Sequence, residues 1–150
     1  MKYKSVNELD QFSFCEAHIS EVSQFGDTFK LALDNVTILP TNPHNRDIQE
    51  MRANETILTF AGSHIKHIIA EGYKVYDANM NLSEEISDSV VSEENYQELF
   101  GAFAEASIYS LEIPADNLCV LVIDTEERTY CITLSYHQAV MEWDRFLKKE

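Results

Sequence analysis

The clearest pattern in the chain is a repeated alternation of apolar and polar side chains. Phe29, Leu31 and Leu33 alternate with smaller or more polar residues, which is the period of a strand with one buried face. Residues 12–40 therefore predict two strands around a turn at 25–27, followed by a second turn or bulge at Asp34-Asn35. Residues 107–114, 118–124 and 129–136 also predict strands, and the last two should pair across the short loop 125–128.

Residues 55–77 are rich in β-branched and aromatic side chains and predict two or three further strands, broken at Gly62 and Gly72. Taken alone, residues 64–71 also fit a short helix. The flanking glycines favour the strand interpretation.

Residues 92–106 predict the best helix of the chain. Ser92 suits the N-cap, and Glu93 and Glu94 put negative charge in the first turn, where the helix dipole favours it. Apolar side chains at three- and four-residue spacing form one stripe, which consists of Tyr96, Leu99, Phe100 and Phe103.

Two patterns fit residues 137–150. An extended strand could continue through Trp143, whereas Lys148 and Lys149 suit the C-terminus of a helix. The helical stripe consists of Tyr136, Val140, Trp143 and Leu147. We expect the helix.

Together these elements predict an α+β fold: a β-rich antiparallel meander of about six to eight strands, able to curl into a barrel-like form, with one amphipathic helix near 92–106. No internal repeat or linker-like stretch divides the chain, so residues 1–150 are expected to form a single domain.

Charge is distributed very unevenly along the chain. The net charge is −15, and the 53 residues between Lys74 and Arg128 contain no Lys or Arg but 13 of the 26 acids. Such a surface repels nucleic acid and anionic membranes and attracts cations or basic proteins. High negative charge that only keeps the protein soluble is the alternative explanation.

The three cysteines, Cys15, Cys119 and Cys131, lie among apolar or β-branched neighbours, and no CxxC motif is present. Buried thiols in a reducing compartment are the simplest interpretation. The N-terminal segment has no apolar core after its lysines, and no apolar run approaches 18 residues. We therefore expect a cytoplasmic protein that does not cross a membrane.

Oxygen-bearing side chains at alternate positions from Asp77 to Glu85 resemble the start of a calcium-binding loop. That loop needs Gly at its sixth position and Glu at its twelfth, where this chain has Leu82 and Asp88, and residues 71–76 predict a strand rather than a helix. The sequence favours a β-hairpin with its turn at 78–81, in which asparagines adopt left-handed backbone.

Other candidate sites are weaker. His64, His67 and Glu71 would share a face only on a helix, and on a strand the two histidines should point to opposite faces. Cys131 and His137 lie roughly 20 Å apart on an extended strand, too far for a catalytic pair. No phosphate-binding, serine-hydrolase or zinc-protease motif is present. The sequence thus predicts no catalytic residue, metal or cofactor and favours a protein that is not an enzyme.

We expect a protein-interaction domain that binds a basic partner through its acidic face. By size and charge alone it is comparable to immunity proteins and antitoxins, which cover the cationic site of a nuclease. The alternative is a small-ligand-binding or enzymatic β-barrel-like domain with inward-facing histidines and tyrosines. Residues predicted to contact the partner are Asp77, Glu84, Glu85, Asp88, Glu93, Glu94 and Glu98, with Tyr73, Tyr76 and Tyr96 as anchors.

Overall fold

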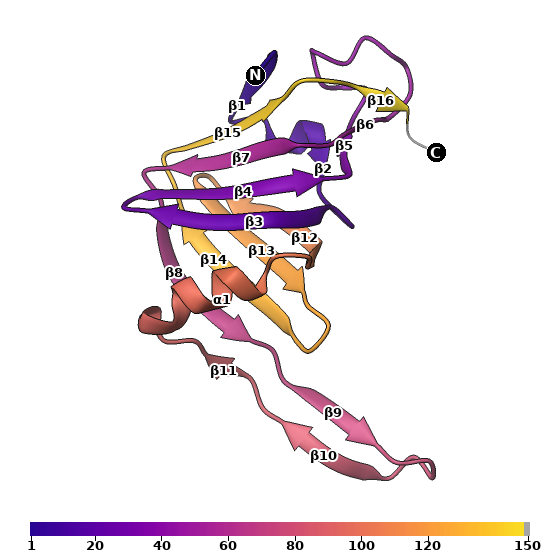
Figure 1. Ribbon diagram of the computed structural model, residues 1–150, viewed down its shortest axis with the longest axis vertical. Helices are drawn as coiled ribbons and strands as arrows, with labels where there is room; N and C mark the ends of the chain where they lie inside the picture. The colour runs from indigo at the N-terminus through magenta and orange to yellow at the C-terminus, as the bar shows by residue number, and fades with distance from the viewer. Residues whose placement is uncertain (149–150) are drawn as a thin grey trace.

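A computed structural model of the chain describes residues 1–148. The structure is mostly antiparallel β-sheet with one short α-helix, which confirms the predicted β-rich α+β class (Figure 1). The strands are β1 (Tyr3–Val6), β2 (Phe12–Ser13), β3 (His18–Phe25), β4 (Thr28–Asp34), β5 (Val36–Ile38), β6 (Met51–Ala53), β7 (Thr56–Ala61), β8 (His64–Ala70), β9 (Tyr73–Tyr76), β10 (Leu82–Ile86), β11 (Ser89–Val90), β12 (Ser107–Ala115), β13 (Leu118–Asp124), β14 (Thr129–Ser135), β15 (Gln138–Trp143) and β16 (Leu147–Lys148). The helix is α1 (Tyr96–Ala102), and two 3-10 turns are η1 (Leu9–Gln11) and η2 (Glu93–Asn95).

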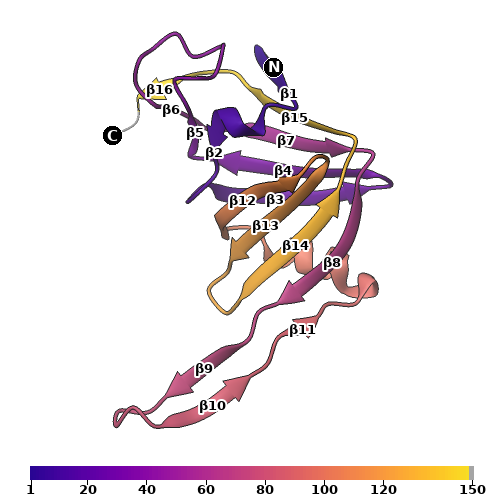
Figure 2. The same ribbon diagram turned by 180° about the vertical axis from the view of Figure 1, so that it is seen from behind.

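Ten of the strands form one antiparallel sheet in the order β1-β15-β7-β4-β3-β12-β13-β14-β8-β11. Its two halves meet at β3 and β12, where Ser107 pairs with His18 and the amide of Ile19 donates to the carbonyl of Ala106 (2.8 Å). The halves run in clearly different directions, so the sheet is strongly bent (Figures 1 and 2). It does not close into a barrel, because β1 and β11 remain as edges, and the barrel-like form considered from the sequence is therefore wrong.

The chain crosses between the two halves twice, and both crossings lie at one corner. Gly62 and Ser63 connect β7 to β8, while Tyr136 and His137 connect β14 to β15. The amide of His137 donates to the carbonyl of Ala61 (2.9 Å), which ties the two crossings together. Gly62 has φ +59°, and a Cβ at this position would overlap the His137 ring. The break between strands that the sequence predicted at Gly62 therefore coincides with the bend of the large sheet.

Helix α1 and the residue that follows it cover the core on one side and contact both halves of the sheet. Phe100 packs edge-on against Phe29 of β4 (5.5 Å between centroids), and Phe103 packs edge-on against Tyr130 of β14 (5.4 Å). The predicted apolar stripe is buried, although the α-helix itself spans only 96–102 of the expected 92–106. Ser92 occupies the N-cap position of η2 but makes no side-chain capping hydrogen bond.

The C-terminal helix expected over residues 137–150 is wrong for the described part of that segment, and residues 149–150 lie outside the described residues. Residues 138–143 form β15, which pairs with β1 on one side and β7 on the other. Its buried side chains, Ala139, Met141 and Trp143, follow a period of two. Because Ala139 is small, the alternation of large apolar residues expected for a strand is weak at 138–143. A helical stripe that also includes Trp143 therefore fits this segment of the sequence equally well.

Two smaller sheets extend from opposite ends of the molecule (Figure 1). The order β16-β6-β5-β2 forms a four-stranded sheet that carries the long loop 39–50, and β9 with β10 forms a two-stranded ribbon. The turns predicted at 25–27 and at Asp34-Asn35 are present, with Phe25 paired to Thr28 and Asn35 at φ +60°.

The corner can be tested with Gly62→Ala. We expect a loss of about 2–3 kcal/mol in the free energy of unfolding, from left-handed backbone and from overlap with the His137 ring. In a His137→Ala background the overlap disappears and the cost should fall to about 1 kcal/mol. Denaturant unfolding of the four variants measures both values. Equal costs in the two backgrounds would show that the imidazole does not restrict the corner.

Candidate functional site

The ribbon of β9 and β10 extends away from the rest of the molecule in both views (Figures 1 and 2), and we call residues 71–88 the arm. Tyr73 pairs with Ile86, and Tyr76 pairs with Leu82. Tyr73 and Tyr76 are three positions apart on one strand, so the two pairs lie on opposite faces. Every residue of β9 is exposed, and Ile86 is the single partly buried residue of β10.

The tip of the arm is a turn, as the sequence predicted, and not a calcium loop. Asp77 Oδ1 accepts hydrogen bonds from the amides of Asn79 and Asn81 (2.9 Å each), and the Asp77 amide donates to the Asn81 carbonyl (2.9 Å). The left-handed residue is Met80 (φ +65°), so the expectation that an asparagine would take this conformation is wrong. The Asp77 side chain instead stabilises the turn through its carboxylate.

The root of the arm, where its two strands leave the large sheet, is held by Arg128, a half-buried residue immediately before β14. Its guanidinium donates to the carbonyls of Glu71 (2.9 Å) and Ala70 (3.4 Å) on one strand and to that of Ser87 (3.1 Å) on the other. It also lies 6.0 Å from the centre of the Tyr73 ring. Three carbonyls from two strands therefore share one cation, which fixes the spacing of the strands where the arm leaves the sheet.

Gly72 and Asp88 complete the root. The Gly72 amide donates to the Asp88 carboxylate, and a Cβ at position 72 would overlap the carbonyl oxygen of Ile86. The break predicted at Gly72 thus reflects close approach of two backbones. Arg128 was not predicted to hold the arm; a single cation next to 53 residues without one was the signal that could have identified it.

All seven acids predicted to contact a partner are exposed, and they fall into two groups. Asp77, Glu84, Glu85 and Asp88 belong to the arm, whereas Glu93, Glu94 and Glu98 lie on η2 and α1. A hollow of about 370 Å³ lies between the root and the helix, lined in part by Val90, Leu99 and Arg128. Glu98 is the one predicted acid in its lining, and the four predicted acids of the arm lie outside it.

The three candidate tyrosines have different environments. Tyr73 is 44% exposed and Tyr76 is 51% exposed, both on the arm. Tyr96 is buried beside Phe100 in the core, where burial, with a smaller effect of Glu93, raises the pKa of its hydroxyl. The arm adds three exposed apolar side chains that sequence reasoning did not select, Val75 (40%), Leu82 (50%) and Met80 (77%).

The weaker candidate sites form no metal-binding cluster. His64 and His67 are both exposed on β8, where a register shift in the pairing with β14 places them opposite Ser135 and Thr133, two positions apart on that strand. The two histidines therefore lie on one face, and the expectation that they point to opposite faces is wrong. Within residues 1–148, no group of three or more His, Cys, Asp or Glu side chains is arranged to hold a metal ion. In the same region, no helix combines the length and apolar character needed to cross a bilayer.

The alternative, a ligand-binding domain, predicts a cavity of a few hundred cubic ångströms. One hollow of about 510 Å³ lies at the end of the molecule opposite the arm, beside loop 39–50. A second hollow of about 400 Å³ lies between the end of α1 and the loop 125–128, with Glu105, Glu126 and Glu127 in its lining.

Comparison with protein-family models, with curated proteins and with solved structures finds no match to this chain. Function is therefore argued from the residues and their geometry alone.

The strands of the arm should exchange their amide hydrogens faster when the hydrogen bonds of Arg128 are removed. Arg128→Ala removes the hydrogen bonds to three carbonyls, so amide exchange over residues 71–88 should rise roughly tenfold, while exchange in β7 and β4 stays unchanged. Hydrogen–deuterium exchange with mass spectrometry measures both regions. Arg145→Ala, at an exposed arginine near the opposite end, is the matched control and should leave the arm as it is. Unchanged exchange in Arg128→Ala would contradict the assignment of Arg128 as the root.

The cysteines differ in environment, and the expectation that all three are buried is wrong for Cys15, which is exposed. Burial raises the pKa of the Cys119 thiol to about 12, and burial with the nearby charge of Glu71 raises the pKa of the Cys131 thiol. A higher pKa leaves less thiolate, the reactive form, at a given pH.

At about pH 8, a disulfide reagent should therefore modify one thiol rapidly in the native protein and three after unfolding. Cys15→Ser should remove the rapid phase. A rapid phase that survives this substitution would show that Cys119 or Cys131 is accessible in the native protein.

Proposed function

We propose that this protein is a protein-interaction domain whose arm binds a basic segment of a partner protein. The observation that carries the proposal is the combination of four exposed acids with exposed Tyr73, Tyr76, Met80 and Leu82 on a ribbon that stands clear of the core.

The arm gains little stability from its own contacts. An isolated two-stranded ribbon is marginal in water, because neither face packs against a second layer. Arg128 fixes its root, but beyond the root both faces carry apolar side chains open to solvent. A partner that covers either face would bury those side chains, and this makes the arm a better contact surface than the half-buried strands of the body.

Charge favours a basic partner. The arm carries one basic residue, Lys74, which pairs with Glu85 across the ribbon, and five acids, so its net charge is negative; the acids are Glu71, Asp77, Glu84, Glu85 and Asp88. Nucleic acid and anionic lipid would be repelled, and two arms would repel each other. A lysine- or arginine-rich surface would be attracted over a distance, with association that weakens as ionic strength rises.

The proposed mechanism has two steps. Long-range attraction first brings the basic surface to the arm and to the acids of η2 and α1. Apolar contact with Tyr76 and Leu82, or with Tyr73 and Val75 on the other face, then slows dissociation. Immunity proteins and antitoxins, which inhibit cationic nucleases, are one class of protein that acts in this way, and the comparison rests on size and charge.

The test is capture from a lysate of the source cells, elution by a salt gradient, and identification by mass spectrometry, followed by binding measurements with the purified partner. We expect a basic protein that elutes at moderate salt. The double variant Glu84→Lys/Glu85→Lys should weaken its binding by at least about tenfold, because attraction becomes repulsion at the arm.

The matched control is Glu112→Lys/Asp116→Lys, which changes the net charge equally at two exposed acids on the hairpin of β12 and β13. It should reduce binding far less than the arm variant. Equal losses would show that net charge alone attracts the partner, and no loss in either variant would refute the role of the arm.

A further inference from the structure

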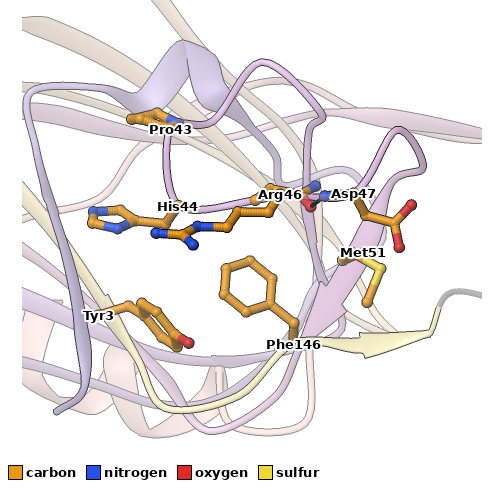
Figure 3. Close-up of a pocket in the computed structure, with 8 residues that line it drawn as sticks. Tyr3, Pro43, His44, Arg46, Asp47, Met51 and Phe146 are labelled. Carbon is orange, nitrogen blue, oxygen red and sulfur yellow. Dashed lines mark hydrogen bonds between the residues drawn. The ribbon is translucent and has the colours of Figure 1, made fainter.

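The hollow of about 510 Å³ lies between loop 39–50 and the strand ends of β1 and β16, at the end of the molecule opposite the arm (Figures 1 and 3). Figure 3 shows His44 and Arg46 on one side of it and Tyr3 and Phe146 on the other. The remaining lining residues are Pro43, Asn45, Asp47 and Met51.

The loop that forms one wall is held in a fixed shape by a buried asparagine. Asn45 Nδ2 donates to the carbonyls of Ile38, Leu39 and Gln49 (3.2 Å each), and Asn45 Oδ1 accepts from the amide of Asp47 (3.0 Å). The backbone on both sides of Arg46 is therefore restrained. A restrained loop loses little entropy when it binds a ligand.

His44 is restrained in the same way. Its amide donates to Asn42 Oδ1 (2.9 Å), and its imidazole lies 3.1 Å from the carbonyl oxygen of Lys4 on β1. These contacts tie the loop to the strand that forms the opposite wall.

The opposite wall is aromatic and rests on Trp143. The Tyr3 ring stacks on Trp143 (5.6 Å, 22° between planes), and Phe146 packs edge-on against both Tyr3 (4.9 Å) and Trp143 (5.9 Å). Trp143 is fully buried, whereas Tyr3 and Phe146 are half-buried. One side of each ring therefore packs inward while part of its surface lines the hollow.

Arg46 adds a positive charge to this aromatic surface. Within residues 1–148 its guanidinium makes no hydrogen bond or ion pair, in contrast to Arg128 with its three carbonyls. Figure 3 shows the guanidinium of Arg46 and the carboxylate of Asp47 at opposite sides of the hollow, so Asp47 does not neutralise it. A free guanidinium favours a carboxylate, which it can bind through two parallel hydrogen bonds.

We propose that this hollow binds a small molecule that combines a planar aromatic ring with a carboxylate. The ring would lie against Tyr3 and Phe146, and the carboxylate would accept hydrogen bonds from Arg46. The proposal is independent of the arm, because the two sites share no residue.

The probe is phenylacetate, and the reporter is Trp143, the single tryptophan of the chain. Trp143 contacts both Tyr3 and Phe146, so a ring bound against them should shift its fluorescence and its indole N–H resonance. We expect a change that saturates below about 10 mM, as suits a fragment of this size. Phenylacetamide and phenethylamine, which keep the ring but lack the negative charge, should bind at least about tenfold more weakly.

Arg46→Gln should weaken phenylacetate binding at least about tenfold, because the charge that pairs with the carboxylate is lost. Arg145→Gln is the matched control: it removes the same charge at an exposed arginine that does not line the hollow, and it should leave binding unchanged. Denaturant unfolding checks that both variants remain folded.

Three results would overturn the proposal: no saturating change up to about 10 mM in the unsubstituted protein, equal binding of phenylacetamide or phenethylamine, or equal loss in Arg46→Gln and Arg145→Gln. The last result would mean that overall charge matters and the position of the Arg46 guanidinium does not. None of these results bears on the arm, whose partner is tested separately.

Discussion

The bend of the large sheet at Gly62 and His137 is the constraint from which the other features follow. At this corner β7 leads into β8 and β14 leads into β15, so each of these two consecutive pairs contributes one strand to each half of the sheet. The halves can then face a common core, which α1 covers through Phe100 on one half and Phe103 on the other. The bend requires a residue with φ +59° and no Cβ, and glycine alone meets both requirements without strain.

The arm is a consequence of unequal strand lengths at the far end of the same sheet. Strand β8 pairs with β14 as far as Ala70, where β14 begins at Thr129, but the chain of β8 continues into β9. Beyond that point no strand among residues 1–148 flanks the ribbon. Arg128 lies at this boundary and binds carbonyls of both strands of the arm, so it supplies the last restraint before the ribbon extends into solvent.

Much of the fold follows from local sequence, and the errors have physical causes. The period of two predicted the β3–β4 hairpin, and the stripe from Tyr96 to Phe103 predicted the buried face of α1, because both patterns report burial directly. The same reasoning failed at 138–143, where Ala139 gives a weak apolar signal, and pairing with both β1 and β7 cannot be seen locally.

The candidate site was predictable in its charge but not in its shape. Tyr73 and Val75 alternate with Lys74 as in a half-buried strand, and only the end of β14 leaves them exposed. Tyr96 shows the opposite case, since its place in the apolar stripe of α1 puts it in the core. Neither Arg46 nor the loop around it carries a periodic signal, because Asn42 and Asn45 fix that loop through backbone carbonyls and amides.

The exposed edges of the arm could also pair with a second copy of the protein, and its acidic side chains oppose such pairing. A ribbon with exposed apolar side chains and two unpaired edges invites pairing with another copy. Glu84 and Glu85 are consecutive on β10 and point to opposite faces, so two arms paired through their β10 edges would place like charges close together on both faces. The same carboxylates would favour a strand or surface that carries lysine or arginine. In the proposed function, discrimination against self-association and attraction of the basic partner depend on the same side chains, so a substitution that neutralised them should weaken both.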